Sequence, residues 1–401
     1  MDLQELRDAI PLQVHRKTDY PPMADQLRGV FSELVEFRRS RGQQIRKAKR
    51  VREHLKAVIL DLWIAANYSD NPYRAVSRNR NNFTKETRYR KIFLKYDLLI
   101  GVIDDLVSLG YLEQKKGFYD RIRNRGYQSR IKATDKLLSI LNFNIKEIVR
   151  NPDAPEDETI IIKDADGEPI DYIDDRFTIE MREFLKSYNQ KLRGTNIGTD
   201  AIDLRYKYDP TAITVKRIFN VDRQGGRFYG GFWENMPKLD RLKLLLESGP
   251  VCELDYSALH PTLAYAGIGI ELNSDPYLIE GCERSEVKSA FLVLFNCRSR
   301  QHAINTIRSE FHVTNAESLI EKIEQKHEAI KATFYNPPYG MYLQNTDAWL
   351  AERVMKRLLE DDILCLPIHD SFIVAKQYED QLYAAMEVCF FEIYSIKPRI
   401  K

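Results

Sequence analysis

The order of hydrophobic and polar positions predicts a chain of mixed helices and strands. In the first third, apolar residues recur at helical spacing in three segments, at 51–68, 85–94 and 97–109. Asp97 is a candidate N-cap of the last segment, and Gly110 is expected to end it. A polar, basic stretch follows over 115–132. Residues 130–134 are expected to run back along its start as a second strand, so that the two form a two-stranded ribbon.

The same third of the chain is strongly basic. Residues 38–56 contain nine Lys or Arg and one acid. Three helices followed by a basic ribbon resemble a winged helix-turn-helix domain, which would bind DNA or RNA. Acidic side chains on the third helix disfavour base reading, so phosphate contacts are expected from the Arg-containing loop at 71–82 and from the ribbon. The ribbon residues in question are Lys115, Lys116, Arg121, Arg123 and Arg125. A winged helix used for packing or protein contact is the alternative.

An acidic segment follows the basic third. Residues 151–185 contain twelve acids and three bases. Strands at 160–163 and 169–172 around Asp166-Gly167 predict a linker hairpin with a primed turn, and a helix is predicted over 178–192. Four parts are therefore expected: a basic helical segment 1–50, a winged-helix-like domain 51–140, an acidic connection 141–200 and a catalytic domain 201–401.

Two carboxylates stand at the ends of apolar segments in the C-terminal half. Asp255 follows the predicted strand 251–254, and Asp370 interrupts the apolar run 365–374 after His369. An ionised carboxylate in such surroundings is unfavourable unless a positive group compensates it. A turn cap or a pair with an arginine is one solution for Asp370. If the two acids meet on adjacent strands, they can instead hold two divalent cations for phosphoryl transfer.

A predicted helix between these acids combines cations and aromatic rings on one stripe. Arg284 and Lys288 are four residues apart, and Phe291 and Phe295 continue the same face. This stripe suits the triphosphate and base of a nucleotide, and an amphipathic helix with solvated basic ends is the alternative. A further helix, over 343–359, leads into the strand before Asp370.

Together these segments resemble the palm and fingers of the family A DNA polymerases and the related single-subunit, phage-type RNA polymerases. The residues that carry the resemblance follow the order of that family's motifs A, B and C: Leu254-Asp255-Tyr256-Ser257, Arg284-x₃-Lys288, and Gln344-x₂₄-His369-Asp370-Ser371. The resemblance covers about residues 215–390. It implies an α+β fold, a right-hand polymerase palm with reduced fingers, preceded by the mostly helical winged helix-turn-helix domain.

The resemblance implies roles for the matching residues. Asp255 and Asp370 would bind two Mg²⁺ or Mn²⁺ ions, with the Tyr256 carbonyl as a further ligand. Arg284 and Lys288 would bind the incoming triphosphate. Lys288, like Asp255 and Asp370, would be a catalytic residue.

On the nucleic-acid side, the resemblance places His369 against the primer terminus and Gln344 near the primer-template duplex. Arg217 and Arg227, in a Gly- and Arg-containing lead-in, would contact template or primer phosphates.

Two positions depart from the family pattern. Asn296, preceded by Phe295, stands where the family usually has Tyr or Phe beside the templating base. His260 stands five positions after Asp255, where the DNA enzymes screen the sugar 2′-hydroxyl. Both are candidate nucleotide contacts, and the choice between deoxyribose and ribose stays open.

The implied activity is a template-directed nucleotidyltransferase, such as the primase-polymerase of a plasmid, phage or other mobile element. Its partners would be a DNA template and primer and nucleoside triphosphates, with an accessory replication protein as a further candidate. Three alternatives stay open: an RNA-synthesising primase or RNA polymerase, a metal-dependent nuclease, and a non-catalytic DNA-binding replication initiator with a degenerate palm.

Composition argues against several other classes. The five cysteines form no Cys-x-x-Cys pair, and the histidines show no ligand spacing, so neither disulfides nor zinc are expected. No window approaches the roughly 18 apolar residues of a membrane span, and the N-terminus lacks the pattern of a signal peptide. A cytoplasmic protein without membrane insertion is therefore expected.

Overall fold

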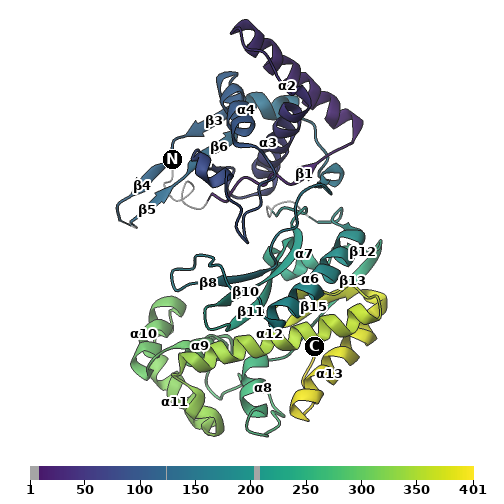
Figure 1. The fold of residues 1–401 in the computed structure, drawn as a ribbon. Helices are drawn as coiled ribbons and strands as arrows, with labels where there is room; N and C mark the ends of the chain where they lie inside the picture. The colour runs from purple at the N-terminus through teal and green to yellow at the C-terminus, as the bar shows by residue number, and fades with distance from the viewer. Residues whose placement is uncertain (1–8, 123, 203–207) are drawn as a thin grey trace. The chain divides into compact units, whose positions relative to one another are not determined.

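The computed structural model describes residues 9–122, 124–202 and 208–401, which form a mixed α and β protein, as predicted (Figure 1). The chain divides into two compact units. The N-terminal unit ends at Glu158 and includes a return segment that ends at Ala212, and the C-terminal unit holds Thr159–Ile202 and Ile213–Lys401. The main boundary therefore falls inside the segment 141–200 that was expected to connect two domains.

Helices and small sheets make up the N-terminal unit. Its helices are α2 (Pro21–Ser40), α3 (Ala48–Tyr68), α4 (Tyr96–Ser108) and α5 (Asp135–Ile140), with 3-10 turns η1 (Arg80–Phe83) and η2 (Ile145–Glu147). Its strands are β1 (Arg16–Lys17), β2 (Arg74–Val76), β3 (Leu112–Lys115), β4 (Phe118–Asp120), β5 (Arg125–Tyr127), β6 (Ser129–Ala133) and β7 (Val149–Arg150). Strand β6 lies between β2 and β3, β4 pairs with β5, and β1 pairs with β7.

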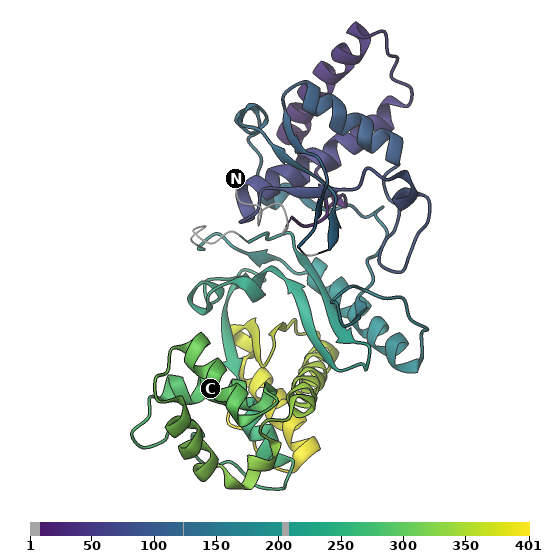
Figure 2. The ribbon, with the colours of Figure 1, turned by 90° about the vertical axis from the view of Figure 1, so that its left-hand side faces the viewer.

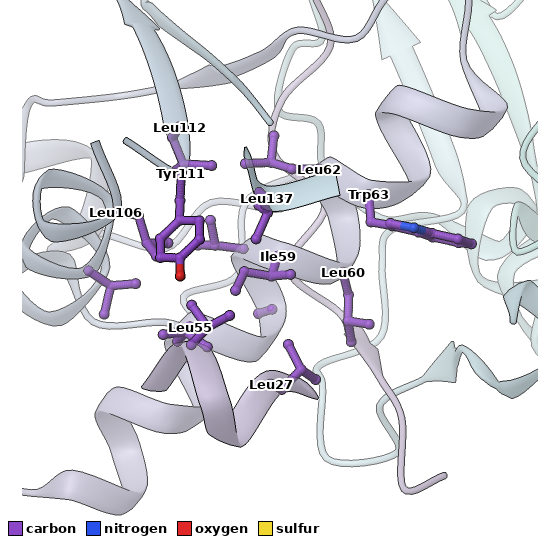
Figure 3. Packing of buried hydrophobic residues seen from close by; sticks show 14 of the residues in the cluster. Leu27, Leu55, Ile59, Leu60, Leu62, Trp63, Leu106, Tyr111, Leu112 and Leu137 are labelled. Atoms are coloured by element: carbon purple, nitrogen blue, oxygen red, sulfur yellow. The ribbon is translucent and has the colours of Figure 1, made fainter. Parts of the chain in front are cut away.

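Helix α3 lies at the centre of this unit's hydrophobic core. Its middle section is buried almost all round, because α2, α4 and β6 all pack against it. Figure 3 shows Leu55, Ile59 and Leu62 of this helix in one cluster with Leu106 of α4 and Leu112 of β3. The helix predicted here from apolar spacing is confirmed.

The helix predicted at 85–94 is wrong. This segment forms turns and extended backbone. The Glu86 carboxylate accepts the backbone N–H of Ile92 at 3.0 Å, and Thr87 and Arg90 pair in an isolated bridge. Side chains that bond nearby backbone groups in this way compete with helical hydrogen bonds.

Helix α4 and the ribbon follow the prediction more closely. The helix has Lys95 as its N-cap, so Asp97 lies in the first turn and pairs with Arg80 instead of capping. Gly110 takes φ +76° and ends the helix as predicted. The ribbon is confirmed as the antiparallel pairing of β3 with β6, and the hairpin β4–β5 extends it.

The C-terminal unit is built from two sheets and a set of helices. Its strands are β8 (Ile160–Lys163), β9 (Ile197–Gly198), β10 (Ile213–Asn220), β11 (Gly225–Gly231), β12 (Leu245–Leu246), β13 (Gly249–Asp255), β14 (Leu366–Ile368) and β15 (Ser371–Ala375). Its α-helices are α6 (Arg176–Gly194), α7 (Lys238–Arg241), α8 (Leu259–Ala266), α9 (Arg284–Asn296), α10 (Arg300–Phe311), α11 (Ala316–Lys326), α12 (Pro337–Glu360) and α13 (Glu379–Tyr394). The 3-10 turns are η3 (Phe232–Asn235), η4 (Glu328–Thr333) and η5 (Lys376–Tyr378).

One sheet has the strand order β14-β15-β13-β12-β9, and the other has the order β11-β10-β8. The long helix α12 packs on β11 and on α13, beside which it runs in Figure 1. Helices α9, α10 and α11 form a separate group, green in Figure 2, which reaches the rest of the unit where α9 packs on α12. In the described parts of the chain, no helix combines the length and apolar character needed to cross a membrane.

Strand β8 forms the predicted hairpin in short form and also belongs to a sheet. Lys163 bridges antiparallel to Pro169, and the N–H of Ile170 donates to the carbonyl of Ile162 at 2.9 Å. The strand pairs in parallel with β10, with Ile160 opposite Arg217. The turn after it is held by Asp164, whose side chain accepts the N–H of Asp166, and only its last residue, Gly167, takes a positive φ, of 81°. The primed turn predicted at this point is therefore wrong.

Helix α6 confirms the helix predicted at 178–192, and the two acids before it serve this helix. Asp175 caps the helix by accepting the backbone N–H of Thr178 at 3.0 Å. Asp174 pairs with Arg182 at 2.7 Å. Both acids therefore have structural roles.

Candidate active site

Strand pairing brings Asp255 and Asp370 to neighbouring positions. Strand β13 runs antiparallel to β15, and the register sets Asp255 opposite Ser371. Asp370 immediately precedes Ser371, and its carbonyl accepts the backbone N–H of Tyr256 at 3.2 Å. The two acids thus lie at the same end of two paired strands, Asp255 as the last residue of β13 and Asp370 in the turn just before β15.

Asp370 stands in the tight turn of a β-hairpin. Ile368 of β14 pairs directly with Ser371 of β15, so His369 and Asp370 alone connect the strands. His369 takes φ +55°, a backbone conformation that is uncommon for a residue other than glycine. Because so short a turn has little freedom, the hairpin fixes Asp370 relative to Asp255.

Burial dominates the electrostatics of the two carboxylates. Burial, followed by the charge of Asp370, raises the pKa of Asp255 to about 6, and the charge of Lys401 opposes this shift. Burial also raises the pKa of Asp370, and the charge of Asp347 adds to that shift. Two partly buried carboxylates this close to each other favour a bound cation, because its positive charge compensates both.

Asp255 and Asp370 are the two carboxylates that could hold a divalent cation at this turn. Within the described ranges, no group of three or more His, Cys, Asp or Glu side chains is arranged to hold a metal ion. Mg²⁺ does not need such a group, since it is commonly bound by one or two carboxylates together with waters and substrate phosphates. Glu253 does not act as a third ligand here, because its carboxylate is bound by Arg241 at 2.8 and 3.0 Å.

Tyr256 is held so that its backbone, and not its ring, belongs to the site. The side chain is 2% exposed, and its hydroxyl donates to the carbonyl of Met386 at 2.7 Å. A contact of the ring with a nucleotide is excluded by this burial. The implied role of the Tyr256 carbonyl as a metal ligand stays a prediction.

A buried carboxylate that the sequence pattern did not single out organises the charges beside Asp370. Asp347 of α12 has a side chain only 1% exposed and forms a two-point ion pair with Arg227 of β11. The same carboxylate lies 2.8 Å from Nε2 of His260. One signal was available: Asp347 lies four residues after Leu343, on the apolar stripe of its helix, where an acid needs a partner.

Arg227 and His260 are therefore positioned by Asp347. The guanidinium of Arg227 lies 3.4 Å from the His260 ring, and the charges of both oppose the rise in the pKa of Asp370. Both residues thus lie close enough to Asp370 for their charges to act on it. In this conformation, however, Arg227 is bound to a protein carboxylate, so a phosphate contact of this residue stays a prediction.

The cations of α9 lie on an exposed helix start that approaches the acids. Arg284 and Lys288 are both exposed, and Arg284 pairs with Asp275 at 2.7 Å while lying over the ring of Tyr277. Burial, followed by the charge of Asp370, raises the pKa of Tyr277. The loop before α9 is therefore close enough to the acids for their charges to act on it.

The aromatic residues of α9 do not offer a stacking surface. Phe295 is 1% exposed and packs against Phe334 and Tyr339. The prediction that Phe295 contacts a nucleotide is therefore wrong, because neighbouring rings cover it. Asn296 is exposed and lies against Gly340 of α12, where an added Cβ would be 2.4 Å from its Oδ1.

Arg217 is a structural residue. Its side chain is 0% exposed, its Nε donates to the carbonyl of Gly226 at 2.6 Å, and it forms an ion pair with Glu352 of α12. The prediction that it contacts nucleic-acid phosphates is wrong, since a side chain with no exposed surface cannot reach them. Gln344, on the same helix, is half-buried, and its predicted contact with the duplex stays a prediction.

His369 carries a polar atom without a partner. Its ring lies edge-on to Tyr229 at 5.8 Å, and its Nδ1 is buried without a hydrogen-bond partner among the described residues. Burial, followed by the charge of Arg227, lowers the pKa of this histidine. A buried nitrogen of this kind needs an explanation, and a ligand hydroxyl at the turn would supply one.

The ribbon of the N-terminal unit keeps several basic side chains accessible. Lys116 and Arg121 are exposed, and Lys115 pairs at 3.0 Å with Glu113 at the surface. Arg123 and the side chain of Arg125 lie outside the described residues.

Two arginines of the preceding loop have protein partners instead. Arg78 pairs with Asp104 at 2.6 Å, and Arg80 pairs with Asp97. These pairs neutralise acids of α4 and leave the ribbon as the better candidate for phosphate contact.

Comparison of the chain with protein-family models and with curated proteins gives no match. The candidate site therefore rests on the residues and their geometry: two carboxylates brought together by strand pairing, and a buried charge cluster beside Asp370.

Proposed function

We propose that the protein is a template-directed nucleotidyltransferase, a DNA polymerase that uses two divalent cations. The observation that carries this proposal is the strand register that sets Asp255 beside Asp370. Metal-dependent phosphoryl transfer needs carboxylates from separate elements that converge on one point, because the ions they hold must lie close together.

The finer assignment of the fold is part of the proposal. The C-terminal unit is a right-hand palm with reduced fingers: the β14–β15 hairpin and β13 carry the acids, and α9, α10 and α11 are the fingers. The N-terminal unit is a winged helix-turn-helix domain, in which β3, β6 and the hairpin β4–β5 form the wing. The order of helices and strands in each unit supports this assignment.

Each part of the site has a role in this reaction. Asp255 and Asp370 would hold the Mg²⁺ or Mn²⁺ ions, which stabilise the entering and leaving oxygens of phosphoryl transfer when bound. Lys288 and Arg284 bring positive charge to the triphosphate, and Arg284 must exchange Asp275 for a phosphate oxygen to do so. His369 offers its free Nδ1 to the primer terminus.

Nucleic acid is held mainly through its phosphates in this proposal. Lys116 and Arg121 are exposed at the ribbon, where they can contact a backbone of any sequence. The acids of helix α4 pair with arginines from other parts of its unit. The helix itself carries no basic residue, so it offers no positively charged face for contacts with base edges.

A primer-extension assay tests the proposal. The full chain is supplied with a primed DNA template, either deoxynucleoside or ribonucleoside triphosphates, and Mg²⁺ or Mn²⁺. We expect extension that a chelator abolishes. Nucleic-acid binding without incorporation under any of these conditions would favour a non-catalytic replication initiator, and shortening of the primer would favour a nuclease.

A further inference from the structure

The segment 399–401 adds to the edge of β13 beside the candidate metal site. The backbone N–H of Asp255 donates to the carbonyl of Lys401 at 3.0 Å, and the N–H of Lys401 donates back to the carbonyl of Asp255 at 3.1 Å. The N–H of Ser257 donates to the carbonyl of Arg399 at 2.7 Å. Asp255 and Lys401 therefore form a hydrogen-bonded antiparallel pair, whose side chains lie on the same face.

This pairing places an ammonium group on a candidate metal ligand. Nζ of Lys401 lies 3.3 Å from Oδ2 of Asp255, and the two side chains are 59% and 23% exposed. On the other side of β13 the register places Ser371 opposite Asp255, and the residue before Ser371 is Asp370, another carboxylate. Lys401 is therefore the cation that forms an ion pair with Asp255 in this conformation, and the charge of Lys238 acts in the same direction.

We infer that Lys401 occupies the charge position of a divalent cation at Asp255, so that metal binding must displace its ammonium group. The inference rests on the proposed function, because it takes Asp255 as a metal ligand. A divalent ion brings twice the charge of the ammonium group and can be held by two carboxylates. At sufficient concentration it therefore displaces the ammonium group from Asp255. Lys401 thereby sets how readily the site takes up metal.

The way this segment is anchored allows the exchange. The backbone bonds to Asp255 and Ser257 hold residues 399–401 in place without help from the lysine side chain. A lysine has a long, flexible stem, and the side chain of Lys401 is more than half exposed, so its ammonium group can move into solvent while the backbone stays.

Direct measurement of Mn²⁺ binding tests this inference. Free Mn²⁺ is followed by electron paramagnetic resonance during titration of the full chain, without nucleotide or nucleic acid. We expect Lys401→Gln to bind Mn²⁺ roughly two- to fivefold more tightly than the unaltered protein, the range for an exposed ion pair. Lys401→Arg keeps the charge and is expected to bind like the unaltered protein.

Lys397→Gln is the matched control. It removes the same charge two residues before the segment 399–401, but Lys397 is 68% exposed and pairs at 3.0 Å with Glu387 of α13 and not with Asp255. We expect its Mn²⁺ affinity to be unchanged. We also expect Lys401→Gln to melt at a lower temperature than the unaltered protein when metal is absent, and its melting temperature to rise more when Mn²⁺ is added. Lys397→Gln should show neither effect.

The outcomes separate this inference from the proposed function. Equal or weaker Mn²⁺ binding by Lys401→Gln than by Lys397→Gln would overturn the inference. Asp255→Asn is expected to bind Mn²⁺ much more weakly; if it binds as tightly as the unaltered protein, Asp255 is not a metal ligand, and the proposed function fails with it.

Discussion

Arg227 of β11 and Asp347 of α12 form a two-point ion pair that ties a strand to the long helix beside Asp370. Loss of one partner leaves the other partly buried without a counter-charge. We expect Asp347→Asn and Arg227→Gln each to lower the free energy of unfolding by about 2 kcal/mol. The double variant should lose clearly less than the sum, because the two residues act on each other.

Urea unfolding of the two single variants and the double variant measures this coupling. Additive losses would show that the pair does not stabilise the junction of strand and helix. The same variants should lose primer extension, because His260 depends on Asp347 for its position.

The burial of Arg217 predicts a loss of stability without a specific loss of nucleic-acid binding. Arg217→Met leaves Glu352 with one cation fewer in a buried setting, and we expect a cost of about 3 kcal/mol in the free energy of unfolding. DNA affinity, measured at a temperature where the variant is folded, should not change. Weaker DNA binding by a variant of unaltered stability would contradict the structural role.

His327 makes the stability of the C-terminal unit depend on pH. Its ring nitrogens lie 2.9 Å from the hydroxyl of Tyr265 and from the carbonyl of Pro276, and burial lowers its pKa from 6.5 to about 4. The unfolded chain therefore binds a proton between these pH values that the folded chain does not bind, so stability falls as the pH falls below 6.5. We expect this residue to contribute a loss of about 2 kcal/mol between pH 7 and pH 5.

Urea unfolding at the two pH values compares the unaltered protein with His327→Gln. The variant should lose less stability on acidification, because glutamine does not titrate. Parallel losses in both proteins would show that His327 is not the group responsible.

The ribbon predicts the salt dependence of nucleic-acid binding. Lys116 and Arg121 are exposed, and phosphate contacts release counterions from DNA. We expect replacement of both by glutamine to weaken DNA binding for all sequences and to reduce the slope of log affinity against log salt by about 2. Lys186→Gln, an exposed change on α6, is the control and should leave the slope unchanged. An unchanged slope in the ribbon variant would place the phosphate contacts elsewhere.

Local pattern was sufficient where a single segment decides the outcome. The apolar spacing of 51–68 predicts α3, because most faces of that helix meet a core. The apolar runs before Asp255 and around Asp370 predict that both acids stand at strand ends, whereas their approach depends on the pairing of β13 with β15, which are far apart in the sequence. Gly110 predicts the end of α4, since only the backbone matters there.

Contacts between distant segments decided the positions that the sequence did not predict. Phe295 shares a helical stripe with Lys288, yet Phe334 covers it, and Arg217 is covered because Glu352 lies on a helix far along the chain. The place of Asp347 on the apolar stripe of α12 indicates that it needs a partner, but only the fold shows that this partner is Arg227 of β11. In each case the partner, not the local pattern, sets the role.

Primer extension by Asp370→Asn tests the central claim most directly. The substitution keeps the size of the side chain and removes the charge that would hold a divalent cation. Asp361→Asn, an exposed acid just after α12, is the control. With Mn²⁺ present, we expect primer extension to fall roughly 100-fold or more in Asp370→Asn and to stay unchanged in the control. Incorporation by Asp370→Asn within twofold of the unaltered protein would contradict the central claim.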